Sequence, residues 1–309
     1  MSTLAVADAR AEALLARLPL RPARITADSR AVAPGAAFAA YPGAHHDGRA
    51  YIGDAIARGA AAVLWETQGF AWNDGWQVPQ LGLEGLKQRL GSIASAVYGH
   101  PSRTLWMVGV TGTNGKTSCA HWTAQALARC GRRTAFVGTL GSGFIGALES
   151  SRNTTPDVCL LHEWFAQWRD QGAAAVAMEV SSHGLDQGRV DGIAFDVALF
   201  TNLTRDHLDY HGTMEAYGEA KAKLFACPGL QASVVNAGDP FGRELIAKLR
   251  ARGQRVIAYG APDADIVATS VVTTATGMAI EVRTPDGGGR LETRLAGAFN
   301  VQNLLGVLG

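Results

Sequence analysis

The stretch Val108-Gly109-Val110-Thr111-Gly112-Thr113-Asn114-Gly115-Lys116-Thr117 decides the fold of this chain. The apolar run 105–110 has the length and β-branched content of a strand, and residues 117–129 predict a helix that ends at Gly131. Between them, glycines allow backbone N–H groups to converge on an anion, and the helix N-terminus adds its positive dipole end. Lys116 would contribute a point charge and Thr117 a hydroxyl ligand for Mg²⁺. We therefore predict a phosphate-binding loop here.

The match to the full phosphate-loop pattern is incomplete. That pattern places a glycine at position 110, where this chain has Val110, so only G-x-x-G-K-T is matched. A chance surface turn is the alternative interpretation. The strand before the turn and the helix after it favour phosphate binding.

Length and composition exclude several classes of protein. The 309 residues suffice for two domains, and 47% hydrophobic with 18% charged residues indicates folded cores. A net charge of +1 without a Lys/Arg block gives no sign of a nucleic-acid or membrane-surface partner. The longest apolar runs are too short to span a bilayer, and we find no secretion signal. The four scattered cysteines indicate reduced thiols and a cytoplasmic protein.

The pattern of elements predicts an α/β fold with two domains. Residues 1–100 alternate short helical and strand segments, including a helix over 11–18, and form a small N-terminal α/β domain. The breaker cluster 99–102 marks the boundary with a central domain, residues 101–309. Apolar segments there predict a mostly parallel sheet buried on both faces, and the alternation over 266–295 predicts an added antiparallel β-meander.

Two local expectations concern the region after the first central helix. Residues 141–146 are glycine-rich and read as a flexible loop. The next helix is expected to have Thr155 as its N-cap and Pro156 at its first position.

Two polar residues follow apolar strands of the predicted parallel sheet. Glu179 ends the run 173–180, and His207 follows the run 195–201. Ligands of open α/β sheets bind at the carboxyl ends of the strands. A carboxylate at that place is a suitable magnesium ligand beside a phosphate loop. The alternative is that Glu179 caps a neighbouring helix.

The predicted helix 214–226 carries a lysine on its apolar face. With Met214 at 0° and ~100° per residue, Lys221 falls near 340°, between Leu224 and Phe225, whereas Lys223 falls on the opposite face. An inward lysine is costly unless its charge is paired or removed. Snorkelling to the surface is one explanation. The other is chemical use: a depressed pKa, an anion partner, or conversion to a carbamate that ligates a metal.

Two motifs of the N-terminal domain leave their role open. Asp28-Ser29-Arg30 is typical of a solvated turn. The pair His45-His46 suggests a metal site but lacks a third ligand at a suitable spacing, so an exposed loop is favoured.

Five motifs in this order resemble the Mur ligases of peptidoglycan synthesis. They are Gly112-Thr113-Asn114-Gly115-Lys116-Thr117, Glu179-Val180-Ser181-Ser182-His183-Gly184-Leu185, residues 201–212, Ala220-Lys221, and Gly297-Ala298-Phe299-Asn300-Val301-Gln302-Asn303. Within that family, Asp28-Ser29-Arg30, Asn153-Thr154-Thr155-Pro156 and Ser181-Ser182-His183 are similar to the branch that adds the third stem-peptide residue to UDP-N-acetylmuramoyl-L-alanyl-D-glutamate.

The resemblance implies an ATP-dependent amide ligation through an acyl phosphate, with meso-diaminopimelate or L-lysine as the incoming diamino acid. By this resemblance, residues 112–118, which include Lys116 and Ser118, would bind the phosphates of ATP. Asn300 and Asn303 would lie near its adenine. Magnesium would be held by Thr117 and Glu179, and by His207 with N6-carboxylated Lys221. The nucleotide substrate would be held by Ser29, Asn153, Thr154, Thr155, Ser181, Gln187 and Arg189. A monomer without a nucleic-acid or membrane partner is expected.

The chain is shorter than the members of this family, which have a further C-terminal domain that binds the incoming amino acid. The chain stops at Gly309 in what reads as a starting helix, so we expect a truncated chain that binds the UDP substrate but ligates poorly or not at all. Two alternatives remain: a sibling such as a folylpolyglutamate synthase or another stem-peptide ligase, and a nucleotide-binding module without catalysis.

Overall fold

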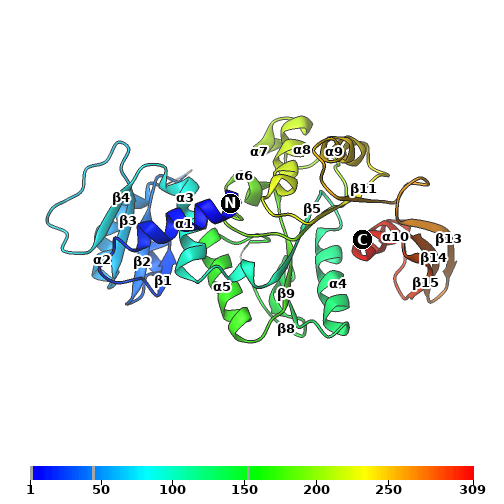
Figure 1. Ribbon diagram of the computed structural model, residues 1–309, viewed down its shortest axis with the longest axis horizontal. Coiled ribbons are helices and arrows are strands. Elements are labelled where there is room, and N and C mark those ends of the chain that lie inside the picture. Colours follow the sequence, from blue (N-terminus) through cyan, green and yellow to red (C-terminus); the bar gives the residue numbers. More distant parts are fainter. Residues whose placement is uncertain (1–2, 44–45, 152) are drawn as a thin grey trace. The chain divides into compact units, whose positions relative to one another are not determined.

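The computed structural model describes residues 3–43, 46–151 and 153–309, which form two compact units (Figure 1). The first unit comprises Met1–Leu105, Pro156–Gln171 and Gly188–Ile193, and the second comprises Trp106–Thr155, Gly172–Gln187 and Ala194–Gly309. The division at residue 100 into a substrate-binding and an ATP-binding domain stays a prediction. His45 of the His45-His46 pair lies outside the described residues.

The first unit is a parallel sheet covered on both faces. Its strands, in the order β1-β2-β3-β4, are β1 (Arg24–Thr26), β2 (Ala36–Ala40), β3 (Ala62–Glu66) and β4 (Gln80–Leu83). Successive residues of β3 belong to different clusters: Leu64 packs with helices α1 (Thr3–Leu15) and α3 (Leu86–Val97), and Val63 packs with α2 (Ile52–Ala57). Both faces are therefore buried, as in other parallel sheets. Helix α5 (Val158–Asp170) packs on α3 and β1.

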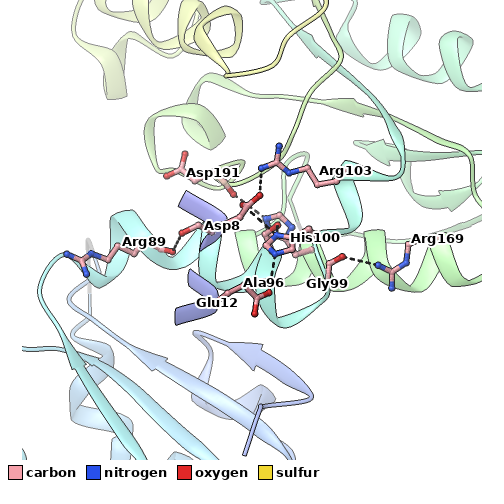
Figure 2. Close-up of polar contacts among 12 residues, drawn as sticks. Asp8, Glu12, Arg89, Ala96, Gly99, His100, Arg103, Arg169 and Asp191 are labelled. Atoms are coloured by element: carbon pink, nitrogen blue, oxygen red, sulfur yellow. Dashed lines mark hydrogen bonds and ion pairs between the residues drawn. The ribbon is translucent and has the colours of Figure 1, made fainter. Parts of the chain in front are cut away.

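Charged residues attach α1 to the segment that follows α3. Figure 2 shows Asp8 and Glu12 of α1 beside His100, whose Nε2 lies 3.2 Å from Glu12 Oε1. Arg103 donates to Asp8 at 2.5 Å. The predicted helix 11–18 is wrong in its bounds, because the alanine-rich segment from Thr3 is itself a good helix former and the helix ends at Leu15.

The second unit contains an eight-stranded sheet in the order β12-β11-β10-β5-β9-β6-β7-β8. Six strands are parallel: β5 (Trp106–Thr111), β6 (Thr134–Gly138), β9 (Ala175–Glu179), β10 (Val197–Phe200), β11 (Ala232–Asn236) and β12 (Val256–Tyr259). Helix α4 (Lys116–Arg129) packs on β5, β6 and β9 (Figure 1). The mostly parallel sheet is thus confirmed.

A separate antiparallel sheet confirms the predicted meander. It consists of β13 (Val267–Thr274), β14 (Gly277–Thr284) and β15 (Gly287–Thr293), and is followed by α10 (Ala298–Leu308). The remaining helices of this unit are α6 (Ser182–Asp186), α7 (Leu208–His211), α8 (Met214–Ala222) and α9 (Pro240–Ala251). In the ranges that the structure describes, no helix is both long and apolar enough to cross a membrane.

Two local predictions are wrong. Residues 141–146 are not a loop, because β7 (Gly141–Phe144) pairs antiparallel with β6 and with β8 (Ala147–Glu149). Gly141 has φ 120°, and a Cβ there would lie 2.5 Å from Glu149 O, so this glycine permits close strand pairing. The N-cap of α5 is Asp157, whose carboxylate accepts hydrogen bonds from the amides of Cys159 and Leu160. Thr155 does not cap this helix, and its hydroxyl donates to Glu179 O.

Candidate active site

The phosphate-loop motif joins the end of β5 to the start of α4. Val110, which occupies the pattern's first glycine position, is still within β5, where it pairs with Leu199 and Glu179 and is fully buried. The positions of the turn that require glycine are 112 and 115, because both have positive φ angles (145° at Gly112 and 83° at Gly115). A Cβ at Gly112 would lie 1.9 Å from Thr201 Oγ1. The departure from the full pattern therefore leaves the turn itself intact.

The segment that follows β10 holds this loop in place. The amide of Thr113 donates to Asn202 O at 2.8 Å. The Asn202 side chain then pairs with both backbone groups of Asn114, accepting from its N–H at 2.9 Å and donating to its carbonyl at 3.1 Å. One amide side chain thus satisfies both polar groups at the middle of the loop. Asn202 was not among the predicted site residues, although its place two residues after β10 was a signal.

Two lysines converge on one carbonyl of the loop. Lys116 Nζ donates to Gly112 O at 3.1 Å and to Thr113 O at 2.8 Å, and Lys221 Nζ donates to Gly112 O at 2.7 Å. Lys221 is 1% exposed, whereas the Lys223 side chain is 51% exposed. The inward orientation of Lys221 is therefore confirmed, and snorkelling is excluded.

The electrostatic environment makes Lys221 unusually easy to deprotonate. Burial, and secondarily the charge of Lys116, lower the pKa of Lys221 to about 7, against the opposing influence of Asp206. Burial also lowers the pKa of Lys116, while Glu179 and Asp206 oppose that shift. A substantial fraction of Lys221 is then a neutral amine near pH 7, which is the form that acts as a nucleophile.

Glu179 lies beside the loop at the carboxyl end of β9 and is 1% exposed. Its carboxylate accepts from the Thr139 amide at 2.7 Å and, among the described residues, from no backbone N–H at a helix N-terminus, so the capping alternative is not what the structure shows. Burial raises the pKa of Glu179, and hydrogen bonds from Thr139 and Thr117 act against that rise. Thr139 was also missed, although it directly follows β6.

The donor set around Glu179 fits a magnesium ion. The Thr117 side chain lies close enough to the Glu179 carboxylate to lower its pKa, and oxygen ligands of this kind are those that Mg²⁺ prefers. His207 (φ 51°) is the N-cap residue of α7, and the centroid of its ring lies 4.8 Å from that of the His183 ring and 6.0 Å from that of the Tyr217 ring. Within the described ranges, no three His, Cys, Asp or Glu residues form a ligand group. Lys221 could join His207 as a metal ligand only after losing its positive charge, as a neutral amine or as a carbamate.

Three residues predicted to bind substrate gather around the end of β9. The Thr155 hydroxyl donates to Glu179 O at 3.0 Å and accepts from the Ser181 amide at 3.0 Å. Ser181 caps α6, and the Thr154 hydroxyl lies 3.1 Å from that of Thr139. Of the other predicted residues, Asn153 is exposed, Gln187 ends α6, and Arg189 lies in the first unit.

The two predicted adenine-side residues occupy the first turns of α10. Asn300 Nδ2 donates to Ala296 O at 2.8 Å. Asn303 is buried, and its Oδ1 would lie 2.3 Å from a Cβ at Gly115. Asn303 therefore contacts the phosphate loop directly. Ser118, in the first turn of α4, is partly buried.

The first unit contains a cleft of about 690 Å³. Asp28 caps the short helix Ser29–Ala31 and forms an exposed ion pair with Arg30, so the motif is a solvated turn. It is also part of the cleft wall, whose lining includes Ser29, Arg30, Tyr41, Tyr51, Arg58 and Asp157. The two interpretations of this motif are thus compatible.

Replacing Glu179 by glutamine should stabilise the metal-free protein. The pKa of Glu179 is raised above 4.5 in the folded state, so its charged form opposes folding. That destabilisation is absent below about pH 4.5, grows as pH rises through the folded pKa, and is constant above it. At pH 8, Glu179→Gln should therefore raise the melting temperature, by about 2–4 °C for each kcal/mol of desolvation free energy removed.

Calorimetry of both proteins at pH 4 and pH 8, with chelator present, measures this difference. The exposed Glu149→Gln serves as the matched control and should change the melting temperature little at either pH. If Glu179→Gln is less stable than wild type at pH 8, the prediction is contradicted, because the charged carboxylate would then stabilise the fold.

Comparisons with known proteins agree with this geometry. The Mur ligase middle domain matches residues 110–309, and the Mur ligase family catalytic domain matches residues 23–98. The chain belongs to the Mur ligase family. It is 50% identical over 297 residues to the UDP-N-acetylmuramoyl-L-alanyl-D-glutamate--2,6-diaminopimelate ligase of Chromobacterium violaceum, covering 96% of this chain and 60% of that protein.

Solved structures show the same similarity. A structure of a UDP-N-acetylmuramoyl-L-alanyl-D-glutamate--2,6-diaminopimelate ligase matches with a TM-score of 0.80 and 31% identity, over 93% of this chain and 58% of that one. MurF ligase from Thermotoga maritima in complex with ADP shares the fold, with a TM-score of 0.64 and 18% identity over 92% of this chain and 61% of that one. The chain thus spans about 60% of the length of the relatives that it matches.

Proposed function

We propose that this chain provides the ATP-binding and UDP-substrate-binding parts of an amide ligase. The reaction joins meso-diaminopimelate to UDP-N-acetylmuramoyl-L-alanyl-D-glutamate. The observation that carries the proposal is the gathering of Lys116, Lys221 and Glu179 around one phosphate-type loop. The name of the Chromobacterium relative supports the choice of substrates. We further propose that the protein acts as a monomer in the cytoplasm, where ATP is available.

The loop is built to hold the ATP phosphates. Backbone N–H groups at the start of α4 would donate to an anion bound there, and the helix dipole favours negative charge at that end. Lys116 now donates to two loop carbonyls, and we expect it to turn from these carbonyls to the β- and γ-phosphates. Thr117 and Glu179 would hold Mg²⁺, which neutralises charge that develops on the transferred phosphoryl group.

The chemistry proceeds in two displacements. A carboxylate oxygen of the D-glutamate residue attacks the γ-phosphorus, the bond to the β-γ bridging oxygen breaks, and ADP leaves. The amine of diaminopimelate then attacks the acyl-phosphate carbon, loses a proton, and phosphate departs from the tetrahedral intermediate. Lys116 is proposed to stabilise charge in the first step, once its ammonium has turned from the loop carbonyls to the phosphates.

Lys221 is proposed to act as a carbamate. Its neutral amine adds to the carbon of CO₂, forming an N–C bond and releasing a proton. The product is a carboxylate in place of a cation, which fits a second Mg²⁺ together with His207. The low pKa of Lys221, about 7, supports this conversion at neutral pH.

The substrate contacts complete the proposal. Thr154, Thr155, Ser181 and Asn153, with Gln187 and Arg189, are proposed to hold the peptidyl end of the nucleotide substrate. Ser29 is proposed to hold the uridine end, in the cleft of the first unit. Ser118 is proposed to assist the phosphate loop, and Asn300 and Asn303 to approach the adenine.

Ligand-induced stabilisation of this chain tests the choice of substrate. At 100 times its dissociation constant, UDP-N-acetylmuramoyl-L-alanyl-D-glutamate should stabilise the protein by about 2.7 kcal/mol, and so raise the melting temperature by several degrees. A folate should give no shift at the same concentration. Stabilisation by folate, or by neither ligand, would reject the proposed substrate and favour a sibling ligase or a non-catalytic module.

A further inference from the structure

Tyr217 contacts three parts of the candidate site at once. It lies one helical turn before Lys221 on α8, so both side chains occupy the same face, and it is 1% exposed. Its hydroxyl is 3.3 Å from Thr113 Oγ1, on the phosphate loop. Its ring centroid is 4.1 Å from Lys221 Nζ and 6.0 Å from the centroid of the His207 ring.

The hydroxyl end of Tyr217 is joined to the loop and to the segment that leads to His207. Thr113 Oγ1 accepts from the Thr204 amide at 3.0 Å, so Thr113 links the loop with residues 201–207. The ring end is held between Lys221 and the imidazoles, because the His211 ring also packs against it at 5.1 Å. The residue therefore has one fixed end on the phosphate loop and a flat face against the amine.

We propose that Tyr217 is a positioning residue that sets the distance of Lys221 and His207 from the phosphate loop. This inference rests on the proposed function, since it gives Lys221 and His207 a shared divalent cation. The aromatic face limits where Lys221 Nζ can lie, and its edge limits the rotation of the His207 ring. The ring carries this positioning, and the hydroxyl contact with Thr113 Oγ1, 3.3 Å, is an additional link on which the position of the ring does not depend. Lys221 and His207 would then hold a divalent ion on the side of the site that faces the phosphate loop.

The two functions of Tyr217 can be separated by substitution. Tyr217→Phe keeps the ring and removes the link to Thr113, whereas Tyr217→Leu removes both. Tyr217→Met replaces the leucine variant if that variant folds poorly, because methionine fills volume without an aromatic face. Tyr259 is the matched control: it is equally buried, lies in the same unit, and donates its hydroxyl to Phe200 O at 3.0 Å.

The experiment counts Mn²⁺ ions bound by this chain with a non-hydrolysable ATP analogue and bicarbonate, from the electron paramagnetic resonance signal of free Mn²⁺. Wild type should bind two ions. In Tyr217→Leu, one ion should bind at least 10-fold more weakly, while the affinity for the ATP analogue without metal changes less than 3-fold. Tyr217→Phe should keep both Mn²⁺ affinities within about 3-fold. Tyr259→Leu should keep both ions despite any loss of thermal stability.

The outcomes separate this inference from the proposed function. If wild type binds neither the nucleotide nor two Mn²⁺ ions, the proposed function fails. If wild type binds both and Tyr217→Leu matches it, only the role of Tyr217 is rejected. Equal loss of Mn²⁺ in Tyr217→Phe and Tyr217→Leu also rejects it, because the ring would then not be the positioning element.

Discussion

Replacing Lys221 by alanine should lower the rate of acyl-phosphate formation by about 10²–10³-fold, the range seen when one preorganised electrostatic group is removed from an active site. The reason is the position of the amine: Lys221 Nζ lies 2.7 Å from Gly112 O and is buried beside Lys116. The rate is measured by trapping the acyl phosphate as a hydroxamate, in a chain with the full length of its relatives.

The matched control is Lys223→Ala, two residues further on the same chain. Lys223 is exposed and paired with Asp186, so this variant should keep at least half of the wild-type rate. Formate or acetate should partly restore Lys221→Ala, since a small carboxylate can occupy the place of the carbamate. If Lys221→Ala has full activity without added carboxylate, the proposed role of Lys221 as a metal-binding carbamate is rejected.

Features with a short-range pattern were predictable from the sequence. The phosphate loop, the strand ends at Glu179 and the inward face of α8 all follow from residues within about ten positions of one another. Helical periodicity alone placed Lys221 inside, and the structure confirms it. The meander over 266–295 was predictable for the same reason, because strand alternation is a local signal.

Contacts between distant segments were not predictable in the same way. Asn202 pairs with Asn114 across 88 residues, and Thr139 bonds Glu179 across 40. Such pairs depend on which strands become neighbours in the sheet, and no local pattern gives that order. The prediction of a loop over 141–146 was wrong for a related reason. The close approach of Gly141 to Glu149 O exists only once β7 and β8 pair.

The second large effect is expected for Lys116→Ala, which should weaken binding of an ATP analogue about 10- to 100-fold. A hydrogen bond to a charged group contributes about 1.5–3 kcal/mol, and each 1.4 kcal/mol is a factor of ten in affinity. Lys116 is held on the loop by the carbonyls of Gly112 and Thr113, so its ammonium is already close to the place of the phosphates. Lys248→Ala, which removes an exposed ion pair with Glu219, is the control.

The central claim is that residues 112–117 hold the phosphates of ATP. Isothermal titration of this chain with a non-hydrolysable ATP analogue and Mg²⁺ tests it most directly. We expect one site per chain in wild type and in Lys248→Ala, and a 10- to 100-fold weaker affinity in Lys116→Ala. Equal affinity of wild type and Lys116→Ala, or no binding to wild type, would contradict it.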